Sequence, residues 1–142
     1  MELSAAQRER YERNLLVEGF TDRMQQALIA ARVAVVGAGG LGSAALNYLV
    51  AAGVGHLTLI ENDTVSLSNL QRQVLYTTAD MGRPKAEVAA MRLSRLNPGC
   101  DIRVVTDRLT AANAAGLLGG HDAVVDCTDN YDARYVIDDF CR

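Results

Sequence analysis

The sequence has few aromatic residues: they make up 5% of its 142 residues, and tryptophan is absent. Hydrophobic residues still reach 49%, so alanine, valine, leucine and glycine must supply the packing. This composition excludes a disordered chain. It is typical of a domain whose helices pack closely on a parallel sheet. The length is sufficient for one domain with its own core.

The sequence also lacks an excess of positive charge and any long apolar run. Its net charge is −3 and its pI is about 5.3, which argues against nucleic acid or an anionic membrane as a partner. No run approaches the ~20 apolar residues that span a bilayer. The first 16 residues show no secretory pattern. We therefore expect a cytoplasmic protein that binds neither nucleic acid nor membrane.

Cysteine is scarce, with three residues: Cys100, Cys127 and Cys141. The odd number and the absence of a close pair argue against a disulfide framework and against a CxxC zinc site. The three thiols are expected to be reduced and mostly buried.

Two helices are expected before the first strand. Ser4 and Gln7 form a capping-box signature for a helix that reaches about residue 16. Thr21 is a candidate cap for a second helix. The helical period predicts that this second helix has one apolar face, formed by Met24, Leu28 and Ala31.

From residue 32 onward, short apolar runs alternate with helical segments. Strands are expected at 33–36, 56–60, 102–106 and 123–127, and helices after residue 42, from Pro84 to 96, at 111–118 and from Tyr131. This order predicts an α/β protein with a Rossmann-like, doubly wound, mainly parallel sheet at 32–142, preceded by two N-terminal helices at 1–31. Because four strands make an incomplete doubly wound sheet, we expect further strands beyond Arg142.

A glycine-rich loop follows the first strand and contains Gly37, Gly39, Gly40 and Gly42. A loop of this type between a strand and a helix brings backbone N–H groups and a helix N-terminus close to phosphates. Glu61 ends the next strand, where a carboxylate can bind both hydroxyls of a ribose. The alternative is a glycine turn that only packs the helix on the strand.

The segment after Glu61 is unusually rich in polar side chains, with Ser68, Asn69, Gln71, Arg72 and Gln73. The carboxyl ends of parallel strands meet at one edge, so these residues can join others there. The pattern suits a triphosphate bound by Arg72 and Lys85, with Mg²⁺ on Asp129. Asn69 and Gln73 could orient these groups or the nucleotide.

Three simpler interpretations of single residues stay open. Arg72 could be a solvated charge, Lys85 could merely begin a helix, and Asp129 could be a helix cap. Two other functions also stay open. An NAD-dependent oxidoreductase or NAD-binding module would explain the glycine loop and Glu61, but it leaves Arg72, Lys85 and Asp129 without a role. A non-catalytic dimerisation or carrier-docking fragment is the other alternative.

Several segments resemble the MoeB/ThiF/HesA adenylyltransferases, which are bacterial relatives of ubiquitin-activating enzymes. The resemblance runs in order from about Arg10 to the end of the chain. It rests on 33-VAVVGAGGLGS-43, 53-GVGHLTLIENDTVSLSNLQRQVLYT-77, 82-GRPKAE-87, 96-LNP-98 and 126-DCTDN-130. A relative of this fold dehydrates a modified tRNA base, but the SNLQRQ segment is closer to the sulfur-carrier group.

The resemblance implies an enzyme that uses Mg·ATP to adenylate the C-terminal glycine carboxylate of a ubiquitin-like sulfur carrier ending in Gly-Gly, with release of pyrophosphate. It implies that Gly40 lies against the phosphates and that Glu61, with Asp63 beside it, binds the ribose. It implies a homodimer in which Arg13 reaches the partner's ATP site. The remaining implied site residues are Ser68, Asn69, Leu70, Gln71, Arg72, Lys85, Asp129 as the Mg²⁺ ligand, and Asn130.

The sequence departs from the family pattern in two ways. The ribose position is Glu61, where aspartate is frequent. The two CxxC zinc pairs, the crossover loop with a candidate catalytic cysteine, and most of the carrier-binding surface would lie beyond Arg142. Zinc is therefore expected only in such a part, and Cys127 and Cys141 do not match the catalytic cysteine. The carrier could belong to thiamine, molybdenum cofactor or another sulfur pathway.

Overall fold

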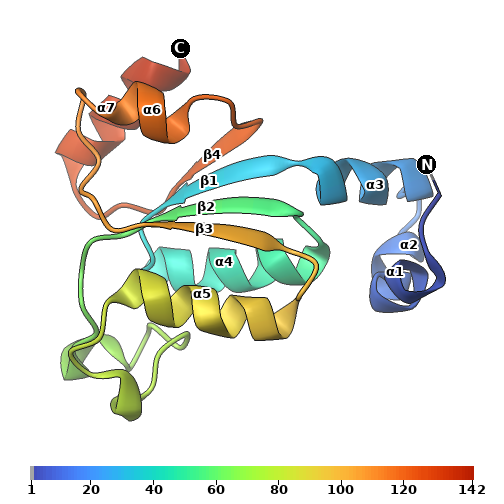
Figure 1. Cartoon of the computed structure of the whole chain (residues 1–142), viewed down its shortest axis with the longest axis horizontal. Helices are drawn as coiled ribbons and strands as arrows, with labels where there is room; N and C mark the ends of the chain where they lie inside the picture. Colours follow the sequence, from blue (N-terminus) through green and yellow to red (C-terminus); the bar gives the residue numbers. More distant parts are fainter. Residues whose placement is uncertain (1) are drawn as a thin grey trace.

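The centre of the protein is a four-stranded parallel sheet (Figure 1). The computed structural model describes residues 2–142. The strand order is β3-β2-β1-β4. The strands are β1 Arg32–Val36, β2 His56–Ile60, β3 Asp101–Val105 and β4 Ala123–Asp126. Because the chain moves to one side of β1 for β2 and β3 and to the other side for β4, the order reverses between β1 and β4.

Helices cover both faces of the sheet, which confirms the doubly wound arrangement (Figure 1). One face carries α4 Gly40–Ala52 and α5 Lys85–Leu96, and the other carries α6 Ala114–Leu118 and α7 Tyr131–Cys141. None of the helices formed by residues 2–142 is long and apolar enough to cross a membrane.

The continuous apolar runs reflect burial on both faces. Val33 and Val35 of β1 belong to the core cluster under α4 and α5. Ala34 and Val36 belong to the cluster under α6 and α7. Since successive side chains of a strand point to opposite faces, a strand buried on both faces has no polar alternation.

Three short helices lie at the amino end of β1, rather than the two expected: α1 Ala5–Arg10, α2 Glu12–Leu15 and α3 Asp22–Ala30 (Figure 1). The capping box of Ser4 and Gln7 is confirmed. The prediction of a single helix up to residue 16 is wrong, because the helix is interrupted at Tyr11, between α1 and α2. This tyrosine is buried, and its hydroxyl accepts a hydrogen bond from Asn97 Nδ2 at 2.9 Å.

The predicted apolar face of α3 is wrong at Met24, whereas Ala31 packs against the core. Met24 is 49% exposed, whereas Gln25 is fully buried. Gln25 tolerates this position because its amide is paired: Nε2 donates to the Ala52 carbonyl at 3.0 Å, and Oε1 accepts from Asn14 at 2.8 Å. A buried polar group costs little when its hydrogen bonds are made.

Other predicted boundaries shift by one to three residues. Pro84 precedes α5 as its N-cap and is not the first helical residue. The helix expected at 111–118 begins at Ala114, because Asn113 Oδ1 accepts from the Thr110 N–H and holds a turn there. The third strand begins at Asp101 and ends at Val105, and the fourth ends at Asp126.

The segment between β2 and α5 contains two 3₁₀ helices, η1 Leu67–Asn69 and η2 Thr78–Asp80, and is fixed by a buried carboxylate. Asp80 is 3% exposed and accepts hydrogen bonds from the backbone N–H and hydroxyl of Thr77, both at 2.8 Å. Arg83 and Arg92 also donate to it. Burial alone would raise the pKa of Asp80, but these hydrogen bonds and guanidinium charges outweigh burial and hold its pKa below the usual range.

Asp80→Asn should destabilise the fold in a pH-dependent way. At pH 7 we expect a loss of about 1–3 kcal/mol of unfolding free energy, because buried donors lose their charged acceptor. The folded-state pKa of Asp80 is the lower one, so its stabilisation is complete above the unfolded-state pKa of about 4 and is lost as the pH falls from there through the folded-state pKa. Urea unfolding from pH 7 to pH 3 should therefore show the difference from wild type shrinking in acid. Asp139→Asn, at an exposed position of α7, is the control; a pH-independent gap for Asp80→Asn would contradict the account.

Candidate functional site

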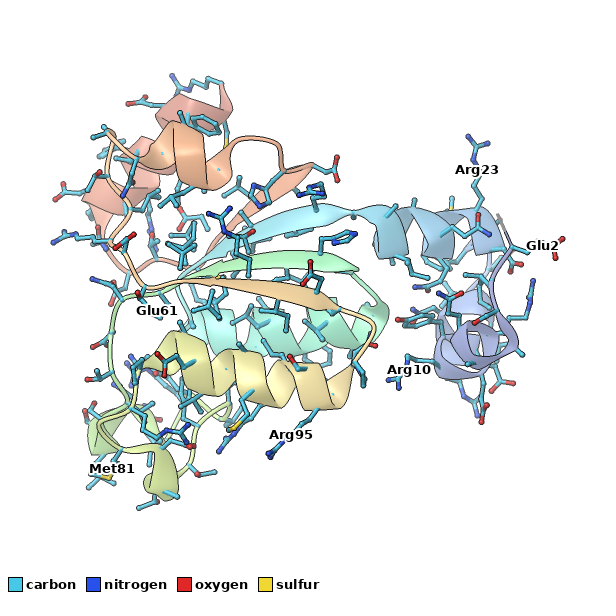
Figure 2. The ribbon with its side chains drawn as sticks, in the orientation of Figure 1. Glu2, Arg10, Arg23, Glu61, Met81 and Arg95 are labelled. Carbon is cyan, nitrogen blue, oxygen red and sulfur yellow. The ribbon has the colours of Figure 1, made fainter. Side chains whose placement is uncertain are left out.

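A cleft of about 900 Å³ opens at the carboxyl ends of the strands, where Glu61 lies in Figure 2. The loops after all four strands line it. Their lining residues include Gly37, Gly39 and Gly40 after β1, Glu61, Asn62 and Asp63 after β2, residues 107–111 after β3, and residues 127–130 after β4. Open α/β sheets bind ligands in this crevice, at the point where the strand order reverses.

The four glycines of the loop after β1 have two different roles. Gly37 has φ of 97°, and a Cβ there would stand 2.6 Å from the Cys127 carbonyl oxygen. A Cβ on Gly42 would stand 2.0 Å from the Gly37 carbonyl oxygen. These two glycines therefore allow the loop, the start of α4 and the end of β4 to pack together. Gly37, Gly39 and Gly40 line the cleft, whereas Gly42 does not.

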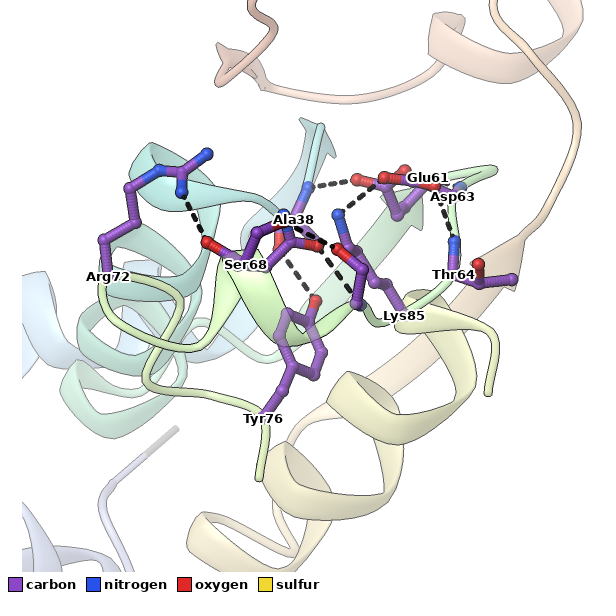
Figure 3. A network of polar contacts seen from close by, with 10 residues as sticks. Ala38, Glu61, Asp63, Thr64, Ser68, Arg72, Tyr76 and Lys85 are labelled. Atoms are coloured by element: carbon purple, nitrogen blue, oxygen red, sulfur yellow. Dashed lines mark hydrogen bonds and ion pairs between the residues drawn. The ribbon is translucent and has the colours of Figure 1, made fainter. Parts of the chain in front are cut away.

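Glu61, Asp63 and Lys85 form a connected polar network beside the glycine loop (Figure 3). Glu61 Oε2 accepts from the Ala38 N–H at 2.7 Å, and Oε1 accepts from the Asp63 N–H at 2.8 Å. Asp63 Oδ2 accepts from Lys85 Nζ at 2.7 Å. Asp63 thus links Lys85 to Glu61 through two successive hydrogen bonds. Glu61, Asp63 and Lys85 all line the cleft, as the sequence predicted.

Tyr76 is hydrogen-bonded to the glycine loop. Its hydroxyl donates to the Ala38 carbonyl at 2.7 Å (Figure 3). Burial raises the pKa of Tyr76, so the phenol stays protonated and remains a donor. Ala38 is therefore fixed on both sides, by Glu61 at its N–H and by Tyr76 at its carbonyl.

Arg72 and Gln73 reach the cleft from the polar segment. Arg72 Nε lies 3.4 Å from the position of a Cβ on Gly40, and Gln73 Nε2 lies 3.3 Å from that on Gly39. The guanidinium donates to the Ser68 carbonyl at 3.3 Å (Figure 3). Gln73 is 3% exposed, and its Oε1 is the one buried side-chain N or O atom within residues 2–142 that has no hydrogen-bond partner. A buried acceptor without a donor is costly, so the side chain of Gln73 is held at an energetic cost beside Gly39.

The other predicted residues of this segment do not line the cleft. Asn69 Oδ1 accepts from the Ser66 N–H at 3.3 Å and closes η1. Leu70 packs against the core, and Gln71 is exposed. The Ser68 carbonyl accepts a hydrogen bond from Arg72, and the Ser68 hydroxyl pairs with that of Ser66. The polarity of the segment thus serves its own turn as well as the cleft.

Asp129 and Asn130 follow β4 and line the cleft. Asn130 is the N-cap of α7, and its Oδ1 accepts from the Ala133 N–H at 2.9 Å. Asp129 is exposed and is not the cap, so the helix-cap interpretation of this residue is excluded. In the described part of the chain, no group of three or more His, Cys, Asp or Glu side chains is arranged to hold a metal ion.

Arg13 does not meet the cleft within one copy of the chain. It is exposed on α2, at the amino end of the sheet (Figure 1), whereas Glu61 lies at the carboxyl end (Figure 2). Within one copy of the chain, Arg13 therefore lies apart from the two other predicted cations, Arg72 and Lys85.

Sequence reasoning missed part of the lining. The missed polar residues are Asn62, Asp107, Arg108, Thr110, Thr128 and Asp132. The loop after β3 follows a predicted strand, so the rule that located Asp129 could have located Asp107 and Arg108 as well. They carry no recognisable motif.

The lining of the cleft is more acidic than basic. It has five carboxylates, Glu61, Asp63, Asp107, Asp129 and Asp132, against three cations, Arg72, Lys85 and Arg108. A highly charged anion bound here therefore needs positive charge beyond what these residues supply.

The cysteines are free thiols, as predicted. Cys100 is buried, and burial raises its pKa to about 11. Burial also raises the pKa of Cys127, which lines the cleft. Cys141 is exposed, contrary to the expectation of burial. A raised pKa disfavours the thiolate, so Cys100 and Cys127 have the character of structural thiols.

The fold and this cleft define a Rossmann-like type of α/β protein with a crevice at the carboxyl ends of its strands. Residues 11–142 match the ThiF family, and the chain belongs to it. This confirms the resemblance that the motifs carry.

Relatives of known name agree with this assignment. The chain is 49% identical over 140 residues to a molybdopterin-synthase adenylyltransferase of Escherichia coli (strain K12), covering 99% of this chain and 56% of that protein. It is 43% identical over 132 residues to the sulfur carrier protein ThiS adenylyltransferase of the same organism, covering 93% and 53%. The chain thus spans about half the length of these curated relatives.

A solved structure shares the fold and contains a nucleotide. The E. coli tRNA N6-threonylcarbamoyladenosine dehydratase TcdA, in complex with ATP, superposes with a TM-score of 0.92 and is 34% identical. The match covers 100% of this chain and 58% of that one.

Proposed function

We propose that the chain forms the nucleotide-binding part of an adenylyltransferase that activates a ubiquitin-like sulfur-carrier protein. In the proposed reaction, Mg·ATP adenylates the C-terminal glycine carboxylate of the carrier and pyrophosphate is released. The named relatives support the reaction class, because two of them are adenylyltransferases acting in molybdopterin and sulfur-carrier chemistry. The ATP-bound structural relative supports ATP as the nucleotide.

One observation carries the proposal: two cations face a glycine loop at the start of a helix. Arg72 lies against Gly40, and Lys85 lines the same cleft. Backbone N–H groups and a helix N-terminus attract phosphates, and the two cations can donate hydrogen bonds to phosphate oxygens. A pyrophosphate bridge alone, as in NAD, leaves these side chains without an obvious partner.

The remaining groups fit the rest of a nucleoside triphosphate. Glu61 is fixed by two backbone N–H groups and keeps lone pairs for ribose hydroxyls. The Gln73 amide nitrogen, which lies beside Gly39 in the cleft, can donate a hydrogen bond to the ligand. Asn130, as the cap of α7, would keep the neighbouring Asp129 at the cleft.

The surplus of carboxylates in the cleft motivates two further parts of the proposal. Asp129 would bind Mg²⁺, which usually takes one or two carboxylates together with phosphate oxygens. Arg13 would come from a second copy in a homodimer, since it is exposed and far from its own cleft. In this arrangement α1–α3 serve the dimer contact, and residues 32–142 form the nucleotide-binding fold.

The chemistry needs cations more than a base. A glycine carboxylate has a pKa of roughly 3.5 and is ionised at neutral pH. Its oxygen forms a bond to the α-phosphorus, the bond between that phosphorus and the bridging oxygen breaks, and pyrophosphate leaves with the electron pair. Lys85, Arg72 and Arg13 would hold the phosphates and stabilise charge in the transition state. Mg²⁺, when bound, would add positive charge at the same oxygens.

Lys85→Ala should abolish most of this activity and leave the fold intact. We expect the rate of pyrophosphate–ATP exchange, measured with a carrier ending in Gly-Gly, to fall by roughly 10²–10³-fold. Lys85→Arg keeps the charge with another geometry and should retain an intermediate rate.

Circular dichroism and thermal unfolding provide the control for both variants, and their unfolding temperatures should stay close to wild type. Near-wild-type exchange by a folded Lys85→Ala variant would refute the assignment. A wild-type chain that binds Mg·ATP but acts on no carrier would favour the tRNA-base chemistry of the TcdA relative instead.

The role of Arg13 is tested by complementation. Arg13→Ala and Lys85→Ala chains should each be nearly inactive, whereas a mixture re-equilibrated into dimers should recover up to about a quarter of wild-type exchange. Half of the dimers are then mixed, and each has one complete site. No recovery in a mixture that forms mixed dimers, as checked by native mass spectrometry, would exclude action across the dimer.

A further inference from the structure

Lys85 is the one lysine among the 14 Lys and Arg residues of the chain. Every other cation is an arginine, so the ammonium at this position stands apart chemically. Its side chain is 4% exposed, although it lines the cleft. A buried ammonium is costly unless a partner compensates its charge.

Asp63 is that partner, and its own position is unusually well determined. Oδ2 accepts from Lys85 Nζ at 2.7 Å, while Oδ1 accepts from the Thr64 N–H at 2.8 Å. The Asp63 N–H donates to Glu61. The Asp63 carbonyl accepts from the Lys85 N–H at 3.0 Å, and a β-bridge joins Thr64 to Pro84. Backbone contacts on both sides of the ion pair thus fix where the carboxylate stands.

Two of the three N–H donors of the Lys85 ammonium have no partner in the described structure. Lys85 Nζ carries three N–H groups, and Asp63 is its one hydrogen-bond partner in the described structure. The other nearby carboxylate, Glu61, is already bound through both oxygens to backbone N–H groups. Contact with Lys85 is also the main reason that the pKa of Asp63 is lowered, so Asp63 remains ionised.

We propose that Asp63 is a positioning residue that fixes Lys85 through one N–H and leaves the other two to bind phosphate oxygens. The effect of Asp63 on catalysis rests on the proposed function, whereas the hydrogen bond between Asp63 and Lys85 does not. It differs from the ribose-side role that the family resemblance implies for Asp63. In this arrangement Asp63 orients the ammonium before the nucleotide arrives, and the nucleotide does not displace it.

Asp63→Asn keeps the shape but removes the charge, and one amide oxygen cannot serve both Thr64 and Lys85. We expect kcat for pyrophosphate exchange to fall by about 10–100-fold, the usual effect of losing a residue that orients a functional group, with little change in the KM for ATP. Asp63→Glu should restore part of the rate. Asp139→Asn, the same change on exposed α7, should have no effect.

A function-independent measurement separates this proposal from the one on which it rests. With lysine-selective ¹⁵N labelling, the side-chain ammonium region should hold one ¹H–¹⁵N signal, from Lys85. This signal should be present in the free wild-type chain and in Asp63→Glu, and lost in Asp63→Asn because the protons exchange with water. A signal unchanged in Asp63→Asn would overturn the positioning role, and so would a raised KM with unchanged kcat. An Asp63-dependent signal in a chain without exchange activity would instead refute only the proposed function.

Discussion

The close approach of backbone to backbone at the glycine loop is the constraint on which the site depends. Gly42 brings the start of α4 onto the Gly37 carbonyl, and Gly37 brings the loop onto the end of β4. Either Cβ would collide with a carbonyl oxygen. Because the contact joins the two strands between which the order reverses, it brings the helix N-terminus and the loop carrying Asp129 to the same cleft.

The rest of the site is attached to that loop by hydrogen bonds. Ala38 is bound by Glu61 on one side and by Tyr76 on the other. Glu61 accepts a hydrogen bond from the Asp63 N–H, and the Asp63 carboxylate accepts one from Lys85. Asp80 holds the far end of the same segment to α5 through Arg92. The ammonium proposed to bind phosphates is thereby positioned by a chain of hydrogen bonds that begins at the glycine loop.

Much of this could be predicted from sequence, and the failures have physical causes. The strand and helix order followed from apolar runs, and the glycine loop and Glu61 followed from their place after strands. The same rule explains why Lys85, Arg72 and Asp129 were found. Polarity alone could not separate Asn69, which closes its own turn, from Gln73, which is buried beside Gly39. Helical periodicity predicted that Met24 is buried in place of Gln25, because a sequence pattern does not show that the hydrogen bonds of a glutamine amide are satisfied.

Binding of Mg·ATP to the wild-type chain tests the central claim most directly. Unfolding should be followed with Mg·ATP and, separately, with NAD. A ligand present at 100 times its dissociation constant stabilises the folded state by about 2.7 kcal/mol. Our account predicts a shift of this size with Mg·ATP, a smaller one when the metal is chelated, and none with NAD. Stabilisation by NAD alone, or by neither ligand, would contradict it.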